Sequence, residues 1–182
     1  MVGGQKATSI YVNEYVRPKS RDRILDIGCG PAETVKYFSD VEYIGFDHNP
    51  AYIEIAKRRF GNQGHFFCGK IDRVTLEEFG AFDLVLAVGV LHHLDDIASL
   101  SLFKLAYKVL KEGGRLVTYD GCFVEGQSGI AQFIISQDRG RFVRNKGEYL
   151  NLACQVFKNV KHELREDLLR IPYTHLIMEC CK

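Results

Sequence analysis

At 182 residues the chain is long enough to bury a substantial core in one domain, and its composition, 46% hydrophobic and 26% charged, is that of an ordinary globular protein. With 24 Lys and Arg against 23 Asp and Glu, its formal net charge of +1 gives no general attraction to nucleic acid or to an anionic membrane. Because no apolar run reaches the roughly 18 to 20 residues of a membrane span and the start MVGGQKATS lacks a signal-peptide core, we expect a cytoplasmic protein with neither a nucleic-acid nor a membrane partner.

Short apolar runs bounded by turn residues predict five strands in the first two thirds of the chain. They cover residues 23–28, 43–48, 65–70, 82–88 and 115–120. Helical patterns lie between most of them. Asn49-Pro50 predicts the start of a helix that ends at Gly61, and an apolar stripe over 100–110 predicts a second helix that ends at the glycine pair 113–114. Strands that alternate with helices predict a parallel sheet covered on both faces.

The two ends of the chain depart from this alternation. Residues 1–20 predict an N-terminal helical segment, and residues 121–146, rich in glycine and arginine, predict an insertion that forms a substrate lid. After a helix near 147–157, two runs at 160–171 and 173–181 are separated only by Pro172, which predicts an antiparallel pair at one edge of the sheet. No repeat or linker is visible, so we expect residues 1–182 to form one domain with seven strands.

The stretch RILDIGCGPAETV, residues 23–35, predicts a strand, a glycine turn and a helix. In a dinucleotide site of the form GxGxxG, a pyrophosphate lies on the helix N-terminus. Here Glu33 replaces the third glycine and Asp26 lies just before Gly28, so two carboxylates would repel a phosphate. They suit S-adenosylmethionine, which carries an ammonium and a sulfonium and no phosphate. The turn alone leaves open a plain strand–helix connection with no ligand.

Two further acidic residues follow later strands. Asp47 ends the second strand about 20 residues after the glycine turn, where a carboxylate can accept both ribose hydroxyls. Asp72 follows the third strand, placed to accept from an adenine amino group while Ile71 covers the ring. Either residue alone could be a turn-forming or exposed carboxylate. The spacing of Asp26, Asp47 and Asp72 together favours a nucleoside site.

With these motifs in place, the sequence resembles the class I S-adenosylmethionine-dependent methyltransferases, especially their small-molecule branch, over about residues 20–120. The matching stretches, in order, are ILDIGCGPAET, YIGFDHNPAYIEIAKRR, FDLVLAVGVLHHLDD and LFKLAYKVLKEGGRLVTYD. The resemblance implies an α/β fold, a three-layer αβα Rossmann-like sheet of seven strands in the order 3-2-1-4-5-7-6 with strand 7 antiparallel.

The resemblance also implies a set of cofactor-binding residues. Asp26, Gly28 and Gly30 would hold the methionine portion of S-adenosyl-L-methionine, and the carbonyl of Val88 would meet its ammonium. Asp47, with the neighbouring His48, would hold the ribose, and Ile71 and Asp72 the adenine. Lys70 stands where the family commonly has an acidic residue, which weakens the adenine assignment.

Methyl transfer is an in-line displacement, so the protein mainly has to align the nucleophile and exclude water. A base helps when the acceptor is a hydroxyl or an ammonium. The candidate catalytic residues are His92 and His93, which follow the fourth strand, and Asp120, which ends the fifth. The alternative is that the histidines only shape the pocket and that Asp120 only forms a turn. No metal is expected, because neither the six cysteines nor Asp120-Gly121 fit a metal-site pattern.

Candidate acceptor-binding residues lie outside the matching core. Arg139, Arg141 and Arg144 could bind a carboxylate or phosphate, and Tyr11, and Tyr173 with His175, could line the same cavity. Alternatively, the arginines form a solvated basic loop and the tyrosines pack in the core. The sequence therefore predicts methyl transfer to a small polar acceptor, anionic if the arginines face it.

Two other classes of function stay open. The chain could be a non-catalytic S-adenosylmethionine-binding partner of another enzyme, which would bind the cofactor without turnover. It could also be an NAD(P)-dependent oxidoreductase on the same architecture, although Asp26 and Glu33 disfavour a dinucleotide. Fold alone settles neither question, because function depends on the site. The acceptor and the oligomeric state are not predicted.

Overall fold

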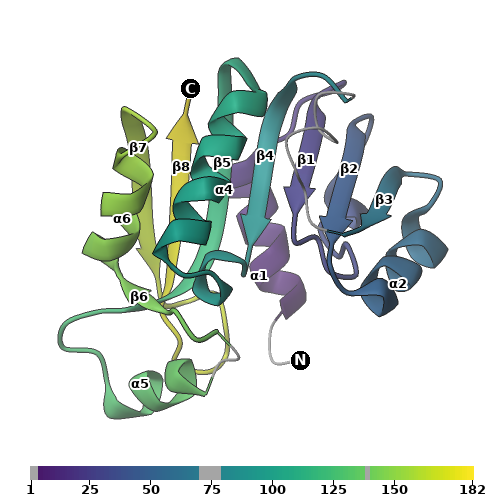
Figure 1. The fold of residues 1–182 in the computed structure, drawn as a ribbon. Helices are drawn as coiled ribbons and strands as arrows, with labels where there is room; N and C mark the ends of the chain where they lie inside the picture. The colour runs from purple at the N-terminus through teal and green to yellow at the C-terminus, as the bar shows by residue number, and fades with distance from the viewer. Residues whose placement is uncertain (1–3, 70–78, 138–139) are drawn as a thin grey trace.

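The computed structural model describes residues 4–69, 79–137 and 140–182 (Figure 1). Over this part of the chain, seven strands form one sheet in the order β3-β2-β1-β4-β5-β8-β7. Neighbours from β3 to β5 pair in parallel, and β8 is antiparallel to both β5 and β7. The strands are β1 Arg23–Ile27, β2 Glu42–Asp47, β3 Gly64–Cys68, β4 Phe82–Val88, β5 Leu110–Phe123, β7 Asn159–Arg165 and β8 His175–Cys181. The predicted sheet, with its antiparallel last strand beside the fifth, is confirmed.

Helices cover both faces of the sheet, which confirms the three-layer architecture (Figure 1). On one face lie α1, a π-helix that continues it, and α2, and on the other lie α4 and α6. Their bounds are α1 Gly4–Ile10, the π-helix Tyr11–Val16, α2 Pro50–Phe60, α4 Asp96–Val109 and α6 Lys146–Cys154. None of the described helices is long and apolar enough to cross a membrane.

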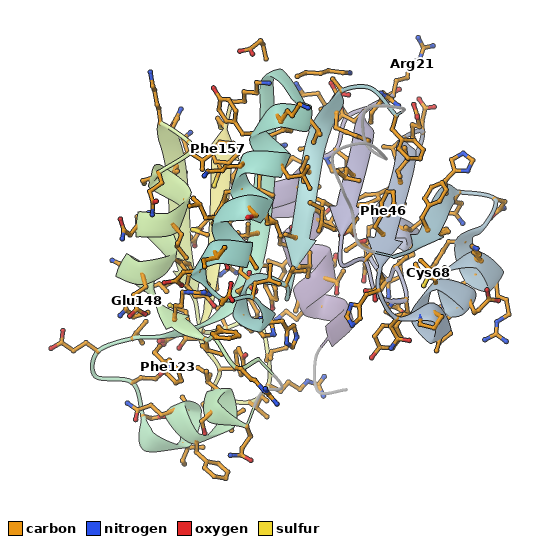
Figure 2. The ribbon with its side chains drawn as sticks, viewed as in Figure 1. Arg21, Phe46, Cys68, Phe123, Glu148 and Phe157 are labelled. Atoms are coloured by element: carbon orange, nitrogen blue, oxygen red, sulfur yellow. The ribbon has the colours of Figure 1, made fainter. Side chains whose placement is uncertain are left out.

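The period of two along the strands supplies a separate core to each face. Leu25 of β1 belongs to the core under α4 and α6, with Phe103 and Phe157, whereas its neighbour Ile24 packs on the other face with Tyr11. Figure 2 labels Phe46 and Phe157, both in the first of these cores, and Arg21, which points away from the molecule. Strands that are buried on both faces read as nearly continuous apolar runs, which explains why they were predictable.

The predicted start of α2 is confirmed, whereas the predicted end of α4 is wrong. The Asn49 side chain accepts from the Ala51 amide at 3.0 Å and caps α2, as predicted. The second helix, α4, ends at Val109 and not at the glycine pair 113–114, and Leu110 already begins β5. The stripe that α4 buries shares only Phe103 with the predicted one, Leu100, Phe103, Tyr107 and Leu110, because several sets of positions fit a helical period. It consists of Ser99, Leu102, Phe103 and Ala106.

The prediction of a helix directly after the glycine turn is wrong. Only a three-residue 3-10 helix, Val35–Tyr37, follows β1. Gly28, Gly30 and Ala32 all have positive φ angles, of 74°, 53° and 57°, so the backbone cannot continue as a right-handed helix until after Ala32. Of the residues between Ala32 and the start of β2 at Glu42, only Val35–Tyr37 are helical.

The connection between the two C-terminal strands is longer than predicted. Residues 166–174, and not Pro172 alone, join β7 to β8. Within the insertion at 121–146, Ser128 caps helix α5, Gly129–Ser136, and the two-residue strand β6, Arg144–Asn145, pairs with the end of β5. Helix α5 lies beyond the edge of the sheet toward which the arrowheads of β1, β2 and β4 point (Figure 1). The single-domain organisation and the lid role of 121–146 stay predictions.

Candidate functional site

Two adjacent cavities open at the edge where β1, β4 and β5 end. The first, of about 390 Å³, is lined by the glycine turn, by Asp26 and by the N-terminal helices, and is called the loop cavity. The second, of about 490 Å³, is lined by His92, Asp120, α5 and the 166–174 connection, and is called the histidine cavity. Four residues line both: Val88, Tyr119, Leu169 and His175. Cavities of this size suit small molecules, and the carboxyl edge of an open α/β sheet is where ligands bind.

Asp26 supplies a buried carboxylate to the loop cavity. Its Oδ2 accepts from the Tyr43 hydroxyl at 2.7 Å and from the Thr34 hydroxyl at 3.4 Å. Its Oδ1 has no hydrogen-bond partner among the described residues. Burial raises the pKa of Asp26 to about 6, against the lowering effect of the two hydroxyls. A buried oxygen without a donor, at the wall of a cavity, is a fitting acceptor for a ligand ammonium.

The two glycines of the turn do different things. A Cβ on Gly28 would lie 2.6 Å from Val90 Cγ2, so this glycine allows the turn to pack against the segment after β4. Gly30 has open space where a Cβ would project, and both residues line the loop cavity. At these two positions the turn therefore presents backbone rather than side chains to a ligand.

Asp47 holds the glycine turn in place. Its Oδ2 accepts from the Gly30 amide at 2.9 Å and its Oδ1 from the Asn49 amide at 2.8 Å. Although only 8% exposed, it lines neither cavity. The predicted neighbour His48 is exposed, with Nδ1 3.7 Å from Asp47 Oδ1. Ile71 and Asp72, predicted for the adenine, lie outside the described residues, so the ribose and adenine roles stay predictions.

Glu33 has a different role from the one that its sequence position suggested. It pairs with Arg59 of α2 and with Lys36, and these contacts lower the pKa of its carboxyl, the bond to Arg59 most of all. It does not cap a helix, because no α-helix follows. It still lines the loop cavity, so it adds negative charge beside Asp26.

A histidine–aspartate pair forms one wall of the histidine cavity. His92 Nδ1 lies 2.8 Å from Asp120 Oδ1, and the His92 amide donates to the same oxygen at 3.2 Å. Both residues are buried, and Asp120 Oδ2 has no hydrogen-bond partner among the described residues. An Nδ1–H bond to a carboxylate fixes the ring orientation and leaves Nε2 as the basic nitrogen.

Tertiary packing distinguishes the two adjacent histidines. A Cβ on Gly140 would lie 2.1 Å from His92 Cδ2, and the Phe142 amide donates to the His92 carbonyl at 2.9 Å, so the insertion packs directly on His92. His93 is exposed, lies 4.2 Å from the His92 ring centroid and lines neither cavity. Only His92 and Asp120 of the three candidate catalytic residues line a cavity.

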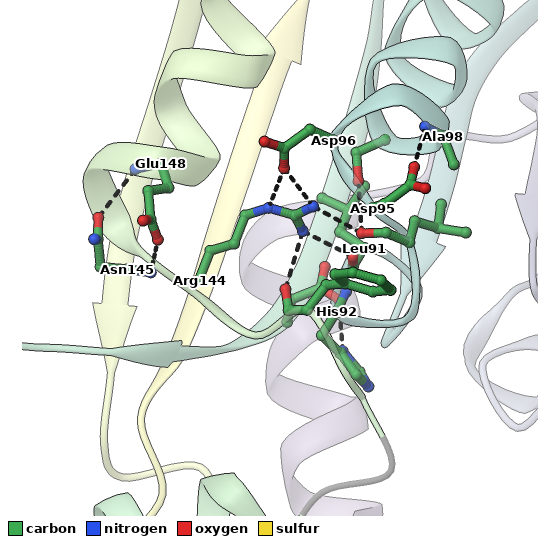
Figure 3. A network of polar contacts seen from close by, with 12 residues as sticks. Leu91, His92, Asp95, Asp96, Ala98, Arg144, Asn145 and Glu148 are labelled. Carbon is green, nitrogen blue, oxygen red and sulfur yellow. Dashed lines mark hydrogen bonds and ion pairs between the residues drawn. The ribbon is translucent and has the colours of Figure 1, made fainter.

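The arginines predicted for the acceptor do not gather at the site. Arg144 is 6% exposed and lines neither cavity. Figure 3 shows its guanidinium on Asp96 and directed at the backbone near Leu91. It donates to Asp96 Oδ1 at 2.8 and 3.0 Å and to the carbonyls of Leu91, Leu94 and Phe142. Arg144 therefore ties the segment that carries His92 to the insertion, which corrects its predicted contact with substrate.

The other predicted acceptor residues divide between the two cavities and the surface. Arg141 is exposed and lines neither cavity, and Arg139 lies outside the described residues. Tyr11 lines the loop cavity and donates from its hydroxyl to the Val117 carbonyl at 3.1 Å. Tyr173 lines the histidine cavity, where its hydroxyl would lie 2.3 Å from a Cβ on Gly121.

Sequence reasoning placed Tyr173 and His175 at the cavity but missed other lining residues, among them Tyr119. Tyr119 stacks on His175 with ring centroids 4.4 Å apart, and His175 lies 4.5 Å from Tyr173, so three rings form an aromatic column along both cavities. Ile134 and Gln137 of the α5 region complete the wall. Tyr119 directly precedes Asp120, which was a usable signal although Asp120 does not end β5 as predicted, because the strand continues to Phe123. Nothing local marked Leu169 or Gln137. Among the described residues no group of three or more His, Cys, Asp or Glu is arranged to hold a metal.

Comparisons with known proteins agree with this geometry. A family model described as a methyltransferase domain matches residues 25–118, just over half of the chain. Probable tRNA methyltransferase 9B of Homo sapiens is 32% identical over 97 residues, which cover 53% of this chain and 20% of that protein. The 27-O-demethylrifamycin SV methyltransferase of Amycolatopsis mediterranei is 32% identical over 124 residues, which cover 62% of this chain and 43% of that protein. The chain thus spans less than half the length of these curated relatives.

Solved structures share the fold. The crystal structure of a TehB-like S-adenosylmethionine-dependent methyltransferase from Corynebacterium glutamicum superposes with a TM-score of 0.68. The match covers 97% of this chain and 88% of that chain at 19% identity. At this identity the likeness concerns the fold alone.

Proposed function

Because this chain belongs to the class I S-adenosylmethionine-dependent methyltransferases, we propose that it transfers a methyl group from S-adenosyl-L-methionine to a small polar acceptor held in the histidine cavity. One observation carries the proposal. A cavity walled by the glycine turn and a cavity walled by His92 and Asp120 adjoin, with Val88 and Tyr119 lining both. Cofactor and acceptor would therefore meet at the end of β4.

The residues of the loop cavity fit the methionine portion of the cofactor. The unpartnered Oδ1 of Asp26 is a buried acceptor for an ammonium, and the open space at Gly30 admits a ligand close to the backbone. Neither cavity has a described Lys or Arg in its wall, so nothing there favours a pyrophosphate. Asp47 would act indirectly, by fixing the Gly30 amide.

When bound, the cofactor supplies a methyl group on a positively charged sulfur, which makes the methyl labile. The chain's own residues then orient the acceptor, exclude water and take up a proton. His92 is the proposed base, held by Asp120 through Nδ1 at 2.8 Å. The side chains of α5 and of the 166–174 connection would close the cavity against solvent, which is the lid role predicted for residues 121–146.

The acceptor proposed here is small and polar. An anionic acceptor was expected from three arginines, but two of them do not support it. Arg144 is bonded within the protein, and Arg141 is exposed and lines neither cavity. A small-molecule partner, with neither nucleic acid nor membrane, and a cytoplasmic location are also part of this proposal.

Calorimetric titration tests the proposal. S-adenosylhomocysteine, the stable product, is expected to bind at micromolar concentration and NAD not to bind. Asp47→Ala is expected to weaken S-adenosylhomocysteine by about 1 to 3 kcal/mol, because the Gly30 and Asn49 amides lose their acceptor. Binding of NAD alone would indicate an oxidoreductase. Cofactor binding with no turnover for any acceptor would indicate the alternative, a non-catalytic partner subunit.

A further inference from the structure

Among the described residues, one carboxylate sets the formal charge of the wall of the histidine cavity. Asp120 is the only Asp, Glu, Lys or Arg among the described residues that line it. The other polar groups in the wall belong to histidine, tyrosine and glutamine side chains. An anionic acceptor would place a second negative charge beside Asp120 with no described cation in the wall to offset it.

One carboxylate oxygen of Asp120 lacks a hydrogen-bond donor among the described residues. The residue is 2% exposed, and its Oδ1 already accepts two bonds from His92. Its Oδ2 is buried and has no hydrogen-bond partner within the described ranges. A buried carboxylate oxygen without a donor is costly unless a ligand supplies one. The chemical complement of this oxygen is an N–H or O–H donor, and the best complement is a charged one.

The rest of the wall suits a hydrocarbon body attached to that donor. Tyr119, Tyr173 and His175 form the aromatic column, and apolar side chains from α5 and from the 166–174 connection line the same cavity. These are Ile134, Leu169 and Ile171. Aromatic rings attract cations and not anions, so this wall and Asp120 select in the same direction.

From these observations we propose that the acceptor is an amine that enters the histidine cavity in its protonated form, with an N–H on Asp120 Oδ2 and an apolar body against the aromatic column. This inference rests on the proposed function and names its substrate class. The ammonium first passes a proton to the His92 imidazole, which regenerates the nitrogen lone pair. That lone pair forms the new C–N bond to the methyl carbon as the C–S bond breaks, and the electron pair of the broken bond stays on sulfur. The product leaves as an N-methylammonium.

A series of probes with one body and three charges tests the proposal on the full chain. Benzylamine, benzyl alcohol and benzoate are titrated at pH 7 into protein that is first saturated with S-adenosylhomocysteine. Saturation with S-adenosylhomocysteine is the separate test of the proposed function, so a failure at that step is distinguishable from a failure of the amine inference. Benzylamine is expected to bind at least tenfold more tightly than benzyl alcohol, and benzoate not to bind.

Variants then assign the effect to a residue. Asp120→Asn is expected to weaken the binding of benzylamine at least tenfold. The variant should bind S-adenosylhomocysteine as wild type does, and this binding also shows that the variant is folded. Arg141→Gln, on the exposed part of the insertion, is the matched control and should leave the series unchanged. Equal binding of the three probes, tightest binding of benzoate, or no binding of benzylamine to the saturated wild-type protein would overturn the proposal whatever the variants do.

Discussion

The loop cavity and the histidine cavity each contain one buried aspartate with one bonded and one unbonded oxygen. In the loop cavity, the bonded oxygen of Asp26 accepts from two neutral hydroxyls, those of Tyr43 and Thr34. In the histidine cavity, the bonded oxygen of Asp120 accepts from the imidazole and amide of His92. Each unbonded oxygen lacks a partner among the described residues.

The difference between the two carboxylates lies in their neighbours. Tyrosine and threonine hydroxyls can orient Asp26 but do not exchange a proton with it at neutral pH. Burial raises the pKa of Tyr43 well above its ordinary value, so this hydroxyl stays protonated. Imidazole can gain and lose a proton in this range. On the functions proposed above, the buried carboxylate would recognise a ligand charge in both cavities, and only in the histidine cavity would it also support a proton acceptor.

The largest effect is expected from removing the imidazole. His92→Ala should lower kcat by about 10²- to 10⁴-fold, because the acceptor loses its base. S-adenosylhomocysteine affinity should be unchanged, because His92 lines only the histidine cavity. The matched variant is His93→Ala, whose side chain is exposed and lines neither cavity. Kinetics with the best acceptor from the charge series measures both. Equal losses in the two variants would contradict the distinction made between the histidines.

Removing the support of the histidine cavity should reduce stability. Arg144→Ala leaves the carbonyls of Leu91, Leu94 and Phe142 without its donors, at about 1 to 3 kcal/mol for each carbonyl that stays buried and unpaired. Arg141→Ala, three residues earlier and exposed, should stay within about 0.5 kcal/mol of wild type. Urea unfolding of both variants gives the comparison. A similar small change in each would mean that Arg144 does not hold this segment.

Neutralising the carboxylate of the loop cavity should affect binding alone. Asp26→Asn is expected to weaken S-adenosylhomocysteine by about 1 to 3 kcal/mol, because a charged acceptor is replaced by a neutral one. Calorimetric titration at pH 7 measures the loss. The amine probe at the histidine cavity should bind the variant as it binds wild type. If the cofactor affinity is unchanged, Asp26 does not contact the ammonium.

The smallest effect is a pH dependence of cofactor affinity. Burial raises the pKa of Asp26 from its ordinary value of 3.8 to about 6 in the folded protein, so folding is favoured by protonation of this group. Its contribution to stability is therefore greatest below pH 4, declines as the pH rises to about 6 and is constant above it. A ligand ammonium prefers the ionised form. S-adenosylhomocysteine should thus bind about tenfold more weakly at pH 5 than at pH 7.

The same titrations on Asp26→Asn provide the control for this pH dependence. The variant has no group that ionises at this position, so its affinity should be flat between pH 5 and pH 7. A slope that persists in the variant would assign the pH dependence to another residue.

Much of the fold and of the loop cavity was predictable because the signals are local. Apolar strand runs, the Asn49 cap and the glycine turn each specify structure within a few residues of themselves. Asp26 and the glycines were predicted on the same grounds, and they line the loop cavity. The turn still misled on the helix after it, because the positive φ of Ala32 is not evident from an alanine.

The histidine cavity was less predictable, because its walls come from segments that are distant in the sequence. His92 and Asp120 are 28 positions apart, and nothing in the His-His pair tells which ring faces the carboxylate. Arg141 and Arg144 are residues of the same type in the same short segment, so the sequence does not distinguish them. Arg144 is the buried one because it bonds to the carbonyls of Leu91 and Leu94, about 50 positions away.

The sequence by itself determined a parallel sheet covered on both faces, because period and turn residues are properties of neighbouring positions. The strand order and the cofactor family came from the family resemblance that its motifs carry. Only the tertiary structure decided which histidine lines a cavity, why Arg144 is not available to a ligand and which oxygens of Asp26 and Asp120 lack donors. These outcomes depend on burial and on hydrogen-bond partners, which long-range packing alone supplies.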